Sequence, residues 1–521
     1  MSNDNHGRGL IDRRTVLRAS TAVAGAAVLP DIVFGQAAPR RGGTLRVAMP
    51  YNPAAVDQMT GRNLPDFNVL YAVYDALIDF DPKTLELKPG LAKAWKFTDP
   101  KTLVLDLVEG VTFHDGTPFN AEAVKVNLER YKSEPRSNVK ADLVTLDKVE
   151  VNGPAQVTLR LNRPNAGLPT MLTNRIGCMV SPKSIAEKGP NLDRVAVGTG
   201  PFKFVEWQDN ISFKLVRNDN YWKKGLPYLD GVEFRIINEL NTLVRAVVAG
   251  EADVGLNLQV QQQMIAARST SVVTEASPSM VFYGAFLNYG RPPLNDIRIR
   301  QAMNYALDRD EINRVVVGGI GQPASAILPK EHWACDPETQ NYYKRDLAKA
   351  KALLAEAGFP NGIEIETYGW SDQIAMQRQE LIISQLAQGG IKVKLNPVAP
   401  QQAMQFFMIE QKATMLISPA GGFPDPSQAY EALFGKEALR NAGKVELPGF
   451  RELLDATMEA SDQAARKAAF VKLQRFVVEN ALQLVQYLSP GVVVRSPKVN
   501  NLVSGLLTTP KFDEVWLAAA A

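Results

Sequence analysis

The sequence predicts a mixed α/β protein of at least two domains. Three observations support this: the length, an ordinary globular composition, and the alternation of strand-like and helix-like segments. The chain has 521 residues, whereas single hydrophobic cores stop growing at roughly 250–300 residues. Apolar residues make up 45% and charged residues 22% of the chain, as expected for a folded globular protein.

The chain begins with the features of an export signal. Arg13 and Arg14 precede a mildly apolar run over 19–29, which is too short to span about 30 Å of hydrocarbon. The arginine pair resembles a twin-arginine signal, and small residues predict cleavage after Ala37. An uncleaved anchor, or a disordered tail with a chance arginine pair, is the alternative. No Cys lies near the cut, so we expect a periplasmic protein without a lipid anchor.

Segments that alternate apolar and polar residues predict strands in the first half of the chain. Asn120 is expected to cap the helix that begins at Ala121, because its side chain can accept from the first free amides. A second helix closes at Gly250 and leads into a short strand. The predicted strands cover 44–49, 102–107, 156–161, 211–216 and 252–256, and the helices 121–131 and 241–250.

The second half begins where Pro292 and Pro293 break the chain. Asn295 is expected to cap a helix over 296–309, whose apolar residues recur at helical spacing. Strand, helix and strand then follow one another, which predicts a βαβ unit. Further segments predict a helix over 346–359 that Gly358 stops, the βαβ unit over 363–396, a helix over 464–481 and a strand over 482–488.

Composition and motifs argue against several functions. The net charge is +3, and removing the four basic and three acidic residues of the leader lowers it to +2. No Lys/Arg cluster is interleaved with aromatic residues, so we expect no nucleic-acid partner. Cys178 and Cys335 lie far apart in the chain. An oxidising compartment would permit a disulfide, but two buried thiols are the simpler interpretation.

The motifs of common enzyme classes are missing. After the leader only His114 and His332 remain as histidines, and no zinc, nucleophile-elbow or phosphate-loop motif is found. "GTGPF" (Gly198–Phe202) lacks the third glycine of a dinucleotide loop and is interpreted as a turn before a strand. His114 and Asp115 could form an acid–base pair, but "DGTP" is typical of a turn. We expect no catalytic residue, no cofactor and no metal.

Four stretches together carry a family resemblance. The longest, "GLAKAWKFTDPKTLVLDLVEGVTFHDGTPFNAEAVKVNLER" (Gly90–Arg130), resembles the signature of the family 5 extracellular solute-binding proteins. These are the peptide- and nickel-type receptors of bacterial ABC importers. Three other stretches resemble the same family: "GTGPFKFVEW" (Gly198–Trp207), "RNDNYW" (Arg217–Trp222) and "FLNYGRPPLNDIRIRQAMNYALDRDEI" (Phe286–Ile312).

The resemblance implies a type II periplasmic-binding-protein fold. Such a fold has two α/β lobes, with an extra subdomain in lobe one, and encloses a ligand by hinge closure. We expect the leader over 1–37, lobe one over 38–287, lobe two over 288–488, and a return to lobe one over 489–521. The implied function is to deliver a small solute or short peptide to an inner-membrane ABC permease, as a monomer. Presentation to a chemosensor, a chaperone-like role and a periplasmic enzyme are the alternatives.

The ligand should meet aromatic and polar side chains at strand ends that face the partner lobe. Flanking glycines place Trp370 and Phe423 outside regular structure, which leaves a ligand role and a core or rim position about equally open for both. For each aromatic residue, a position in the core or at the rim is the alternative. The candidates from strand ends are Tyr51, Asn52, Tyr368, Trp370, Phe423 and Tyr487.

Charged candidates bear on the class of ligand. Arg62 and Arg378 could each bind a carboxylate through two hydrogen bonds, although a solvated position or a salt bridge within one lobe is the favoured alternative. The loop of Asp425 resembles the family's "DPD" loop, but capping of the following helix is favoured over ligand contact. Peptide-binding members commonly carry an aspartate where this chain has Gly422, which puts recognition of a free peptide amine in doubt. The same loop has no His for nickel.

Overall fold

The computed structural model describes residues 38–61, 64–460 and 462–519. The predicted leader, with Arg13, Arg14 and Ala37, lies outside the described residues, and so does Arg62. No helix within the described ranges is long and apolar enough to cross a lipid bilayer.

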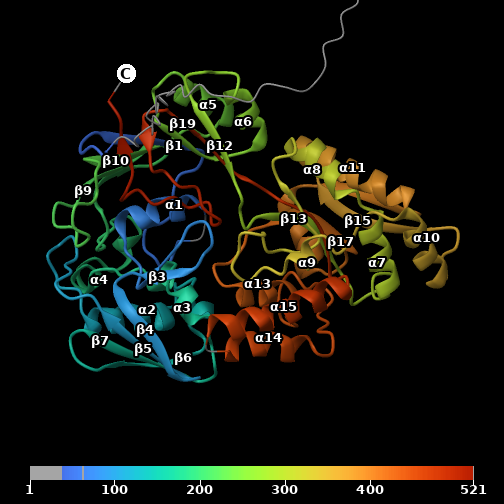
Figure 1. Ribbon diagram of the computed structural model, residues 1–521, viewed down its shortest axis with the longest axis horizontal. Coiled ribbons are helices and arrows are strands. Elements are labelled where there is room, and N and C mark those ends of the chain that lie inside the picture. Colours follow the sequence, from blue (N-terminus) through green and yellow to red (C-terminus); the bar gives the residue numbers. More distant parts are fainter. Residues whose placement is uncertain (1–37, 62–63, 461, 520–521) are drawn as a thin grey trace, which may run out of the picture. The chain divides into compact units, whose positions relative to one another are not determined.

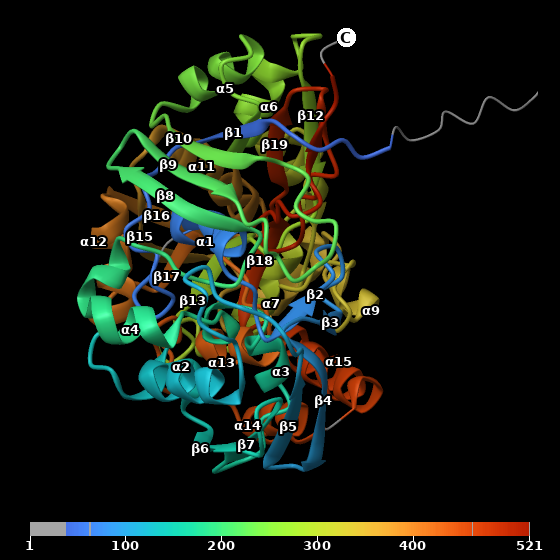
Figure 2. The same ribbon diagram turned by 90° about the vertical axis from the view of Figure 1, so that its left-hand side faces the viewer.

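The first sheet has seven strands in the order β12–β19–β11–β1–β10–β9–β8. Its central strand β1 (Thr44–Met49) runs parallel to β10 (Gly231–Ile236) and to β11 (Val254–Leu258). β1 is buried over most of its length, which explains its apolar sequence "TLRVAM". Figure 2 shows β1 and β10 beside the hairpin of β8 and β9. The outer strands are β8 (Phe202–Gln208), β9 (Ser212–Arg217), β12 (Val273–Ser277) and β19 (Gly491–Arg495).

A smaller antiparallel sheet has the order β4–β5–β7–β6. The helix α2 (Ala121–Ser133) packs on β6 and β7, and Figure 1 shows it in blue-green beside this sheet. Asn120 caps the helix as expected, because its side chain accepts from the amide of Ala123 at 3.0 Å. The strands are β4 (Ala92–Asp99), β5 (Thr102–Leu107), β6 (Leu146–Val151) and β7 (Gln156–Leu161). Two small two-stranded sheets pair β2 (Ile78–Phe80) with β3 (Leu87–Pro89) and β20 (Val499–Asn500) with β21 (Trp516–Leu517).

A further sheet, called the second sheet below, has the order β14–β18–β13–β17. The chain passes into it from the seven-stranded sheet between β12 and β13, and returns between β18 and β19. A boundary after residue 287 would leave β13 with the first sheet, but β13 pairs with β17 and β18, so it belongs to the second. These strands are β13 (Phe282–Leu287), β14 (Gln322–Pro323), β17 (Met415–Ala420) and β18 (Gln483–Leu488).

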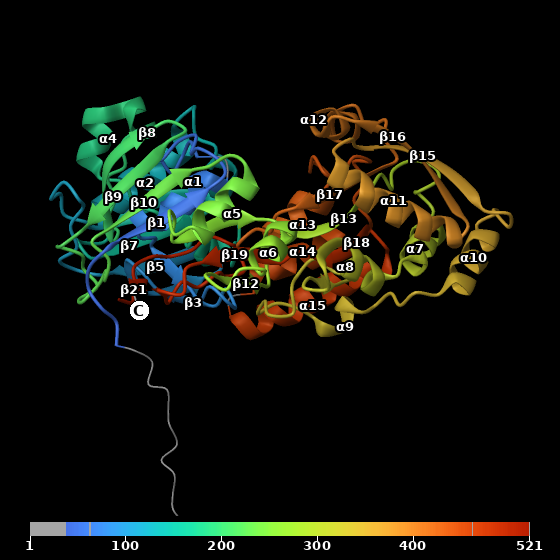
Figure 3. The ribbon, with the colours of Figure 1, turned by 90° about the horizontal axis from the view of Figure 1, so that it is seen from above.

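The predicted βαβ unit is confirmed. β15 (Ile363–Trp370) and β16 (Ile391–Val398) are parallel, and α11 (Gln373–Gln388) joins them. Figure 3 shows α11 alongside both strands, and α11 contacts both of them. The glycine beside Trp370 does not end the strand: Trp370 is the last residue of β15, which corrects its predicted place outside regular structure.

The helix predicted over 296–309 is two helices. Asp296, not Asn295, caps the first of them, because its carboxylate accepts from the amide of Arg298 at 2.9 Å. The backbone is extended at Leu307, and Asp308 caps the next helix. The helices not yet named are α1 (Leu64–Val73), α3 (Leu168–Met171), α4 (Pro182–Lys188), α5 (Leu240–Val248), α6 (Val260–Ala266), α7 (Ile297–Ala306), α8 (Arg309–Val317), α9 (Pro337–Gln340), α10 (Leu347–Glu356), α12 (Pro400–Met404), α13 (Pro426–Phe434), α14 (Phe450–Glu459) and α15 (Gln463–Glu479).

Candidate functional site

The carboxyl ends of β1 and β11 form one edge of the first sheet, where ligands commonly bind in open α/β sheets. Tyr51 follows β1 and is 58% exposed, so it is free to contact a ligand. Asn52 is not free. Its Oδ1 accepts from Trp207 Nε1 at 3.2 Å and from the amide of Asn210 at 3.0 Å, and its amide nitrogen donates to Asp209. Asn52 therefore fastens the loop to the β8–β9 hairpin, which corrects its predicted ligand role.

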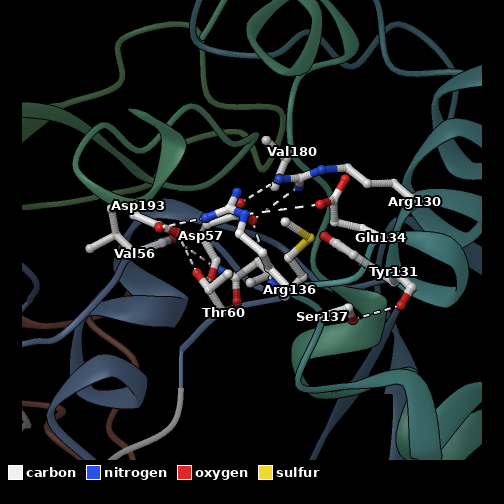
Figure 4. A network of polar contacts seen from close by, with 12 residues as sticks. Val56, Asp57, Thr60, Arg130, Tyr131, Glu134, Arg136, Ser137, Val180 and Asp193 are labelled. Carbon is white, nitrogen blue, oxygen red and sulfur yellow. Dashed lines mark hydrogen bonds and ion pairs between the residues drawn. The ribbon is translucent and has the colours of Figure 1, made fainter. Parts of the chain in front are cut away.

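A network of charged groups also holds the loop that follows β1 (Figure 4). The buried carboxylate of Asp57 forms an ion pair with Arg130 of α2, and Arg130 Nη1 donates to it at 3.0 Å. Arg136 donates to Asp193 at 2.9 Å, and Asp193 also accepts from Thr60. The loop that leads from β1 towards α1 is thereby fixed before any ligand arrives.

An amide pair that the sequence analysis missed lies at this edge. Asn68 of α1 is fully buried and donates from Nδ2 to Asn257 Oδ1 at 2.5 Å. Asn68 Oδ1 has no hydrogen-bond partner among the described residues. Buried polar atoms are normally paired, so this oxygen is an unsatisfied acceptor within the described part of the chain. The signal in the sequence was Asn257, an amide within the otherwise apolar strand "VGLNL".

In the second sheet, Tyr283 and Tyr487 lie near the two segments in which the chain crosses between the sheets. The pairing of β13 with β17 and β18 places Tyr283 opposite both Pro419 and Tyr487. The rings of Tyr283 and Tyr487 stack at 5.1 Å with an interplanar angle of 16°. Tyr487 is only 1% exposed, and burial raises the pKa of its hydroxyl above the ordinary value. Tyr283 is half-buried.

Trp370 and Arg378 extend this cluster from β15 and α11. The backbone of Trp370 is held by Gln379, which donates to its carbonyl at 2.8 Å and accepts from its amide at 3.0 Å. Trp370 Nε1 is buried without a partner among the described residues. The guanidinium of Arg378 lies 4.3 Å from the centre of the Tyr283 ring and hydrogen-bonds with Tyr487.

Asp425 does not reach towards a ligand. Its Oδ1 accepts from the amide of Ser427 at 3.0 Å, so it caps α13. Arg466 donates to both carboxylate oxygens, at 2.7 and 2.8 Å, and both side chains are buried. Burial alone would raise the pKa of Asp425, but the Arg466 guanidinium holds it below its ordinary value. The capping role that the sequence analysis favoured for Asp425 is therefore confirmed.

The other aromatic candidates pack mainly against the protein. Tyr368 meets Phe406 edge to face at 4.7 Å. Phe423 is half-buried, lies outside regular structure as expected, and packs against the main hydrophobic core. A side chain at Gly422 has no room, because its Cβ would lie 2.2 Å from Met280 Cβ. At Gly421 a Cβ would meet nothing within 4 Å, so open space remains beside the loop.

The residues considered for catalysis occupy a turn. The Nδ1 of His114 accepts from the amide of Gly198 at 3.3 Å, and its Nε2 lies 3.0 Å from the carbonyl of Gly200. Asp115 accepts from the Thr117 amide within the turn. Burial lowers the pKa of His114 to about 4. The histidine thus joins two turns and stays neutral.

Two buried cysteines and one crevice beside Arg466 are further features of the described chain. Cys178 and Cys335 are both free and buried. The described residues contain no group of three or more His, Cys, Asp or Glu that could hold a metal ion. A crevice of about 650 Å³ is lined by residues of β4, α3 and α15 and by Trp333, and it includes none of the predicted ligand residues.

A family model covers most of the chain. Residues 86–440 match the family model described as "Bacterial extracellular solute-binding proteins, family 5 Middle". The chain belongs to this family. It is 33% identical to the glutathione-binding protein GsiB of Pectobacterium atrosepticum over 65% of this chain and 66% of that protein. The identity to GsiB of Escherichia coli K12 is 30%, over 69% of this chain and 70% of the relative.

Solved structures of the family show the fold. DppA from Helicobacter pylori, in complex with the peptide STSA, aligns with a TM-score of 0.76 at 24% identity, over 92% of this chain and 98% of that one. CtaP from Listeria monocytogenes aligns with a TM-score of 0.82 at 23% identity, over 92% of this chain and all of that chain. This family 5 protein therefore has the expected two-lobe type II fold.

Proposed function

We propose that this family 5 protein is the receptor of an ABC importer, and that it captures a small peptide-like solute between two lobes. One lobe would comprise residues 39–277 and 491–519, and the other residues 282–488, because the two main sheets divide the chain there. A solute stabilises closure only through contacts that it makes with both lobes. The relatives named for glutathione and the structures solved with peptides support this class of solute.

One observation carries the proposal: each proposed lobe has a buried polar atom without a partner among the described residues. Asn68 Oδ1 is an acceptor in the first lobe, and Trp370 Nε1 is a donor in the second. Leaving such atoms unpaired costs about 1–3 kcal/mol each, so a solute that pairs both would favour closure. We propose that Tyr51, Trp370 and Phe423 contact this solute and that Tyr487 supports the site from beneath.

Calorimetry with reduced glutathione and with a series of dipeptides tests this function, together with small-angle scattering for closure. We expect one solute per protein and a smaller radius of gyration in its presence. Trp370→Phe, which keeps the ring and removes the donor, should weaken binding by about 1 kcal/mol. Native mass spectrometry of protein purified gently from cells would detect a bound solute that is neither glutathione nor one of the dipeptides. A protein that carries no solute, binds none and never closes would contradict the proposal.

We also propose that the protein acts in the periplasm after cleavage behind Ala37, without a lipid anchor. The leader pattern and the extracellular character of the family support this. N-terminal sequencing of the exported protein would locate the cut. Replacing Arg13 and Arg14 with lysine should block export if the twin-arginine route is used.

A further inference from the structure

Gln379 is a buried amide whose oxygen and nitrogen both hydrogen-bond with the backbone of one other residue. It lies on α11 and is 0% exposed. Its Nε2 donates to the carbonyl of Trp370 at 2.8 Å, and its Oε1 accepts from the amide of Trp370 at 3.0 Å. The side chain therefore pairs with Trp370 as a residue of a neighbouring antiparallel strand would. It completes an edge of β15 at the last residue of that strand.

The backbone at Trp370 is also held from its other edge. β15 is parallel to β16, and Trp370 lies opposite Val398 in the register. The amide of Ser371 donates to the carbonyl of Val398 at 3.0 Å. Asp372 then caps α11, the helix that carries Gln379. Trp370 is thus the end of a strand that is fixed on both sides and joined directly to its own clamp.

Gly369 provides the space that this amide occupies. A Cβ at this position would lie 2.2 Å from Gln379 Oε1 and 2.6 Å from Leu395 Cδ1. Gly369 has no positive φ, so the need for space, rather than for an unusual backbone conformation, explains the glycine. The glycine before Trp370 and the buried glutamine of α11 are therefore two parts of one arrangement.

The side chain of Trp370 remains free although its backbone is held. The indole is half-buried, and its Nε1 has no hydrogen-bond partner among the described residues. Fixing a contact residue in its bound position beforehand lowers the entropy that binding costs. We infer that Gln379 is a positioning residue for solute binding: it stays buried and sets the place of the Trp370 indole before the solute arrives. This inference rests on the proposed receptor function and adds the residues that prepare its site, Gln379 and Gly369.

Gln385 of the same helix is the matched control. It is 1% exposed, its Oε1 accepts from the amide of Asp308 at 2.9 Å, and its Nε2 donates to Glu311 at 2.7 Å. These partners lie at the start of α8, not at Trp370. Gln379→Met and Gln385→Met each keep the length of the side chain and remove both hydrogen bonds. Both variants should unfold at a lower temperature than the wild type, so a loss of stability alone does not separate the two roles.

Fluorine NMR of the solute-free protein, labelled with 5-fluorotryptophan, tests the position of the indole. The chain has six tryptophans, and the resonance of Trp370 is the one that Trp370→Phe removes. We expect Gln379→Met and Gly369→Ala each to shift or broaden this resonance, and Gln385→Met to leave it unchanged. The resonances of the other tryptophans report at the same time whether each variant is folded.

Calorimetry with reduced glutathione and the dipeptide series then measures the effect on binding. We expect Gln379→Met to weaken binding about tenfold, and Gln385→Met to leave the affinity unchanged. In the background of Trp370→Ala, Gln379→Met should have no further effect. This double-mutant cycle isolates the effect that passes through Trp370, because an effect through the neighbouring Arg378 would persist in that background.

Three results would overturn the inference. The first is a Trp370 resonance that Gln379→Met leaves unchanged, and the second is one that Gln385→Met changes as much. The third is that Gln379→Met and Trp370→Ala have additive effects on binding. These results would leave the receptor function intact, whereas a wild type that binds none of the solutes and never closes would remove both.

Discussion

At the scale of single residues, His114 links the stability of the fold to pH. Burial lowers its pKa to about 4, while the unfolded chain should titrate near 6.5. Between these values the unfolded state binds more protons, so the stability present above about pH 6.5 is lost as pH falls to 4. The shift corresponds to about 3 kcal/mol at most. Burial lowers the pKa of His332 to about 3, which adds a second contribution of the same sign.

We therefore expect the free energy of unfolding to decrease on acidification from pH 7 to pH 4.5, as measured by urea titration. His114→Gln should make the decrease shallower, because it removes one of the two histidines while keeping a side chain that can hydrogen-bond. The control is His332→Gln, which should leave the contribution of His114 in place. Equal slopes for wild type and His114→Gln would contradict the role assigned to burial.

At the scale of elements, two helix caps that look alike in sequence should contribute differently to the stability of the fold. Asp425 caps α13 and is buried against Arg466, whereas Asp346 caps α10 and is exposed. Asn caps a helix about as well as Asp does, so Asp346→Asn should be nearly neutral. Asp425→Asn leaves a buried cation unpaired and should cost about 3–5 kcal/mol. Thermal unfolding of the two variants checks this, and similar losses in both would contradict it.

Local patterns predicted several of the longer strands and helices because alternation and capping depend on neighbouring residues. The structure confirms β1, β5 and β7 with the expected bounds, and Asn120 as a cap. Partnerships between distant residues could not be predicted in the same way. The side chain of Asn52 hydrogen-bonds with residues around 207–210, and no local signal in the loop after β1 reveals these partners.

The same limit applies to the candidate site. The type of side chain marked Trp370 and Arg378 as candidates, but only the fold shows that a buried nitrogen of each has no partner among the described residues. Conversely, Asp425 is an acidic residue in a loop that resembles the family's "DPD" loop, but in the structure both of its carboxylate oxygens accept hydrogen bonds from Arg466. The sheet that holds β13 depends on pairing with strands more than 100 residues later, so the boundary after 287 could not be corrected from sequence.

At the scale of the whole molecule, one side-chain contact joins the two proposed lobes away from the solute residues. Gln428 of α13 donates to Asp142 Oδ1 at 3.0 Å, across 286 positions of sequence. Burial raises the pKa of Asp142, so this carboxylate is already poorly solvated. A second carboxylate at this point would repel the first and oppose closure.

We expect Gln428→Glu to weaken binding of reduced glutathione about tenfold, which corresponds to about 1.4 kcal/mol. Adding Asp142→Asn should restore affinity, because the new amide can donate to the new carboxylate. Calorimetry on both single variants and on the double variant gives the coupling energy of the pair. Additive effects would show that the contact does not contribute to closure.

The place of β19 has a consequence for how the chain is made. This strand, formed by residues 491–495, lies between β11 and β12, which are synthesised more than 200 residues earlier. Until it leaves the ribosome, β11 and β12 each present an unpaired edge, the kind of surface on which nascent chains aggregate. The first sheet therefore stays incomplete while the residues between β12 and β19 are synthesised, and its open edges must be shielded until β19 is available.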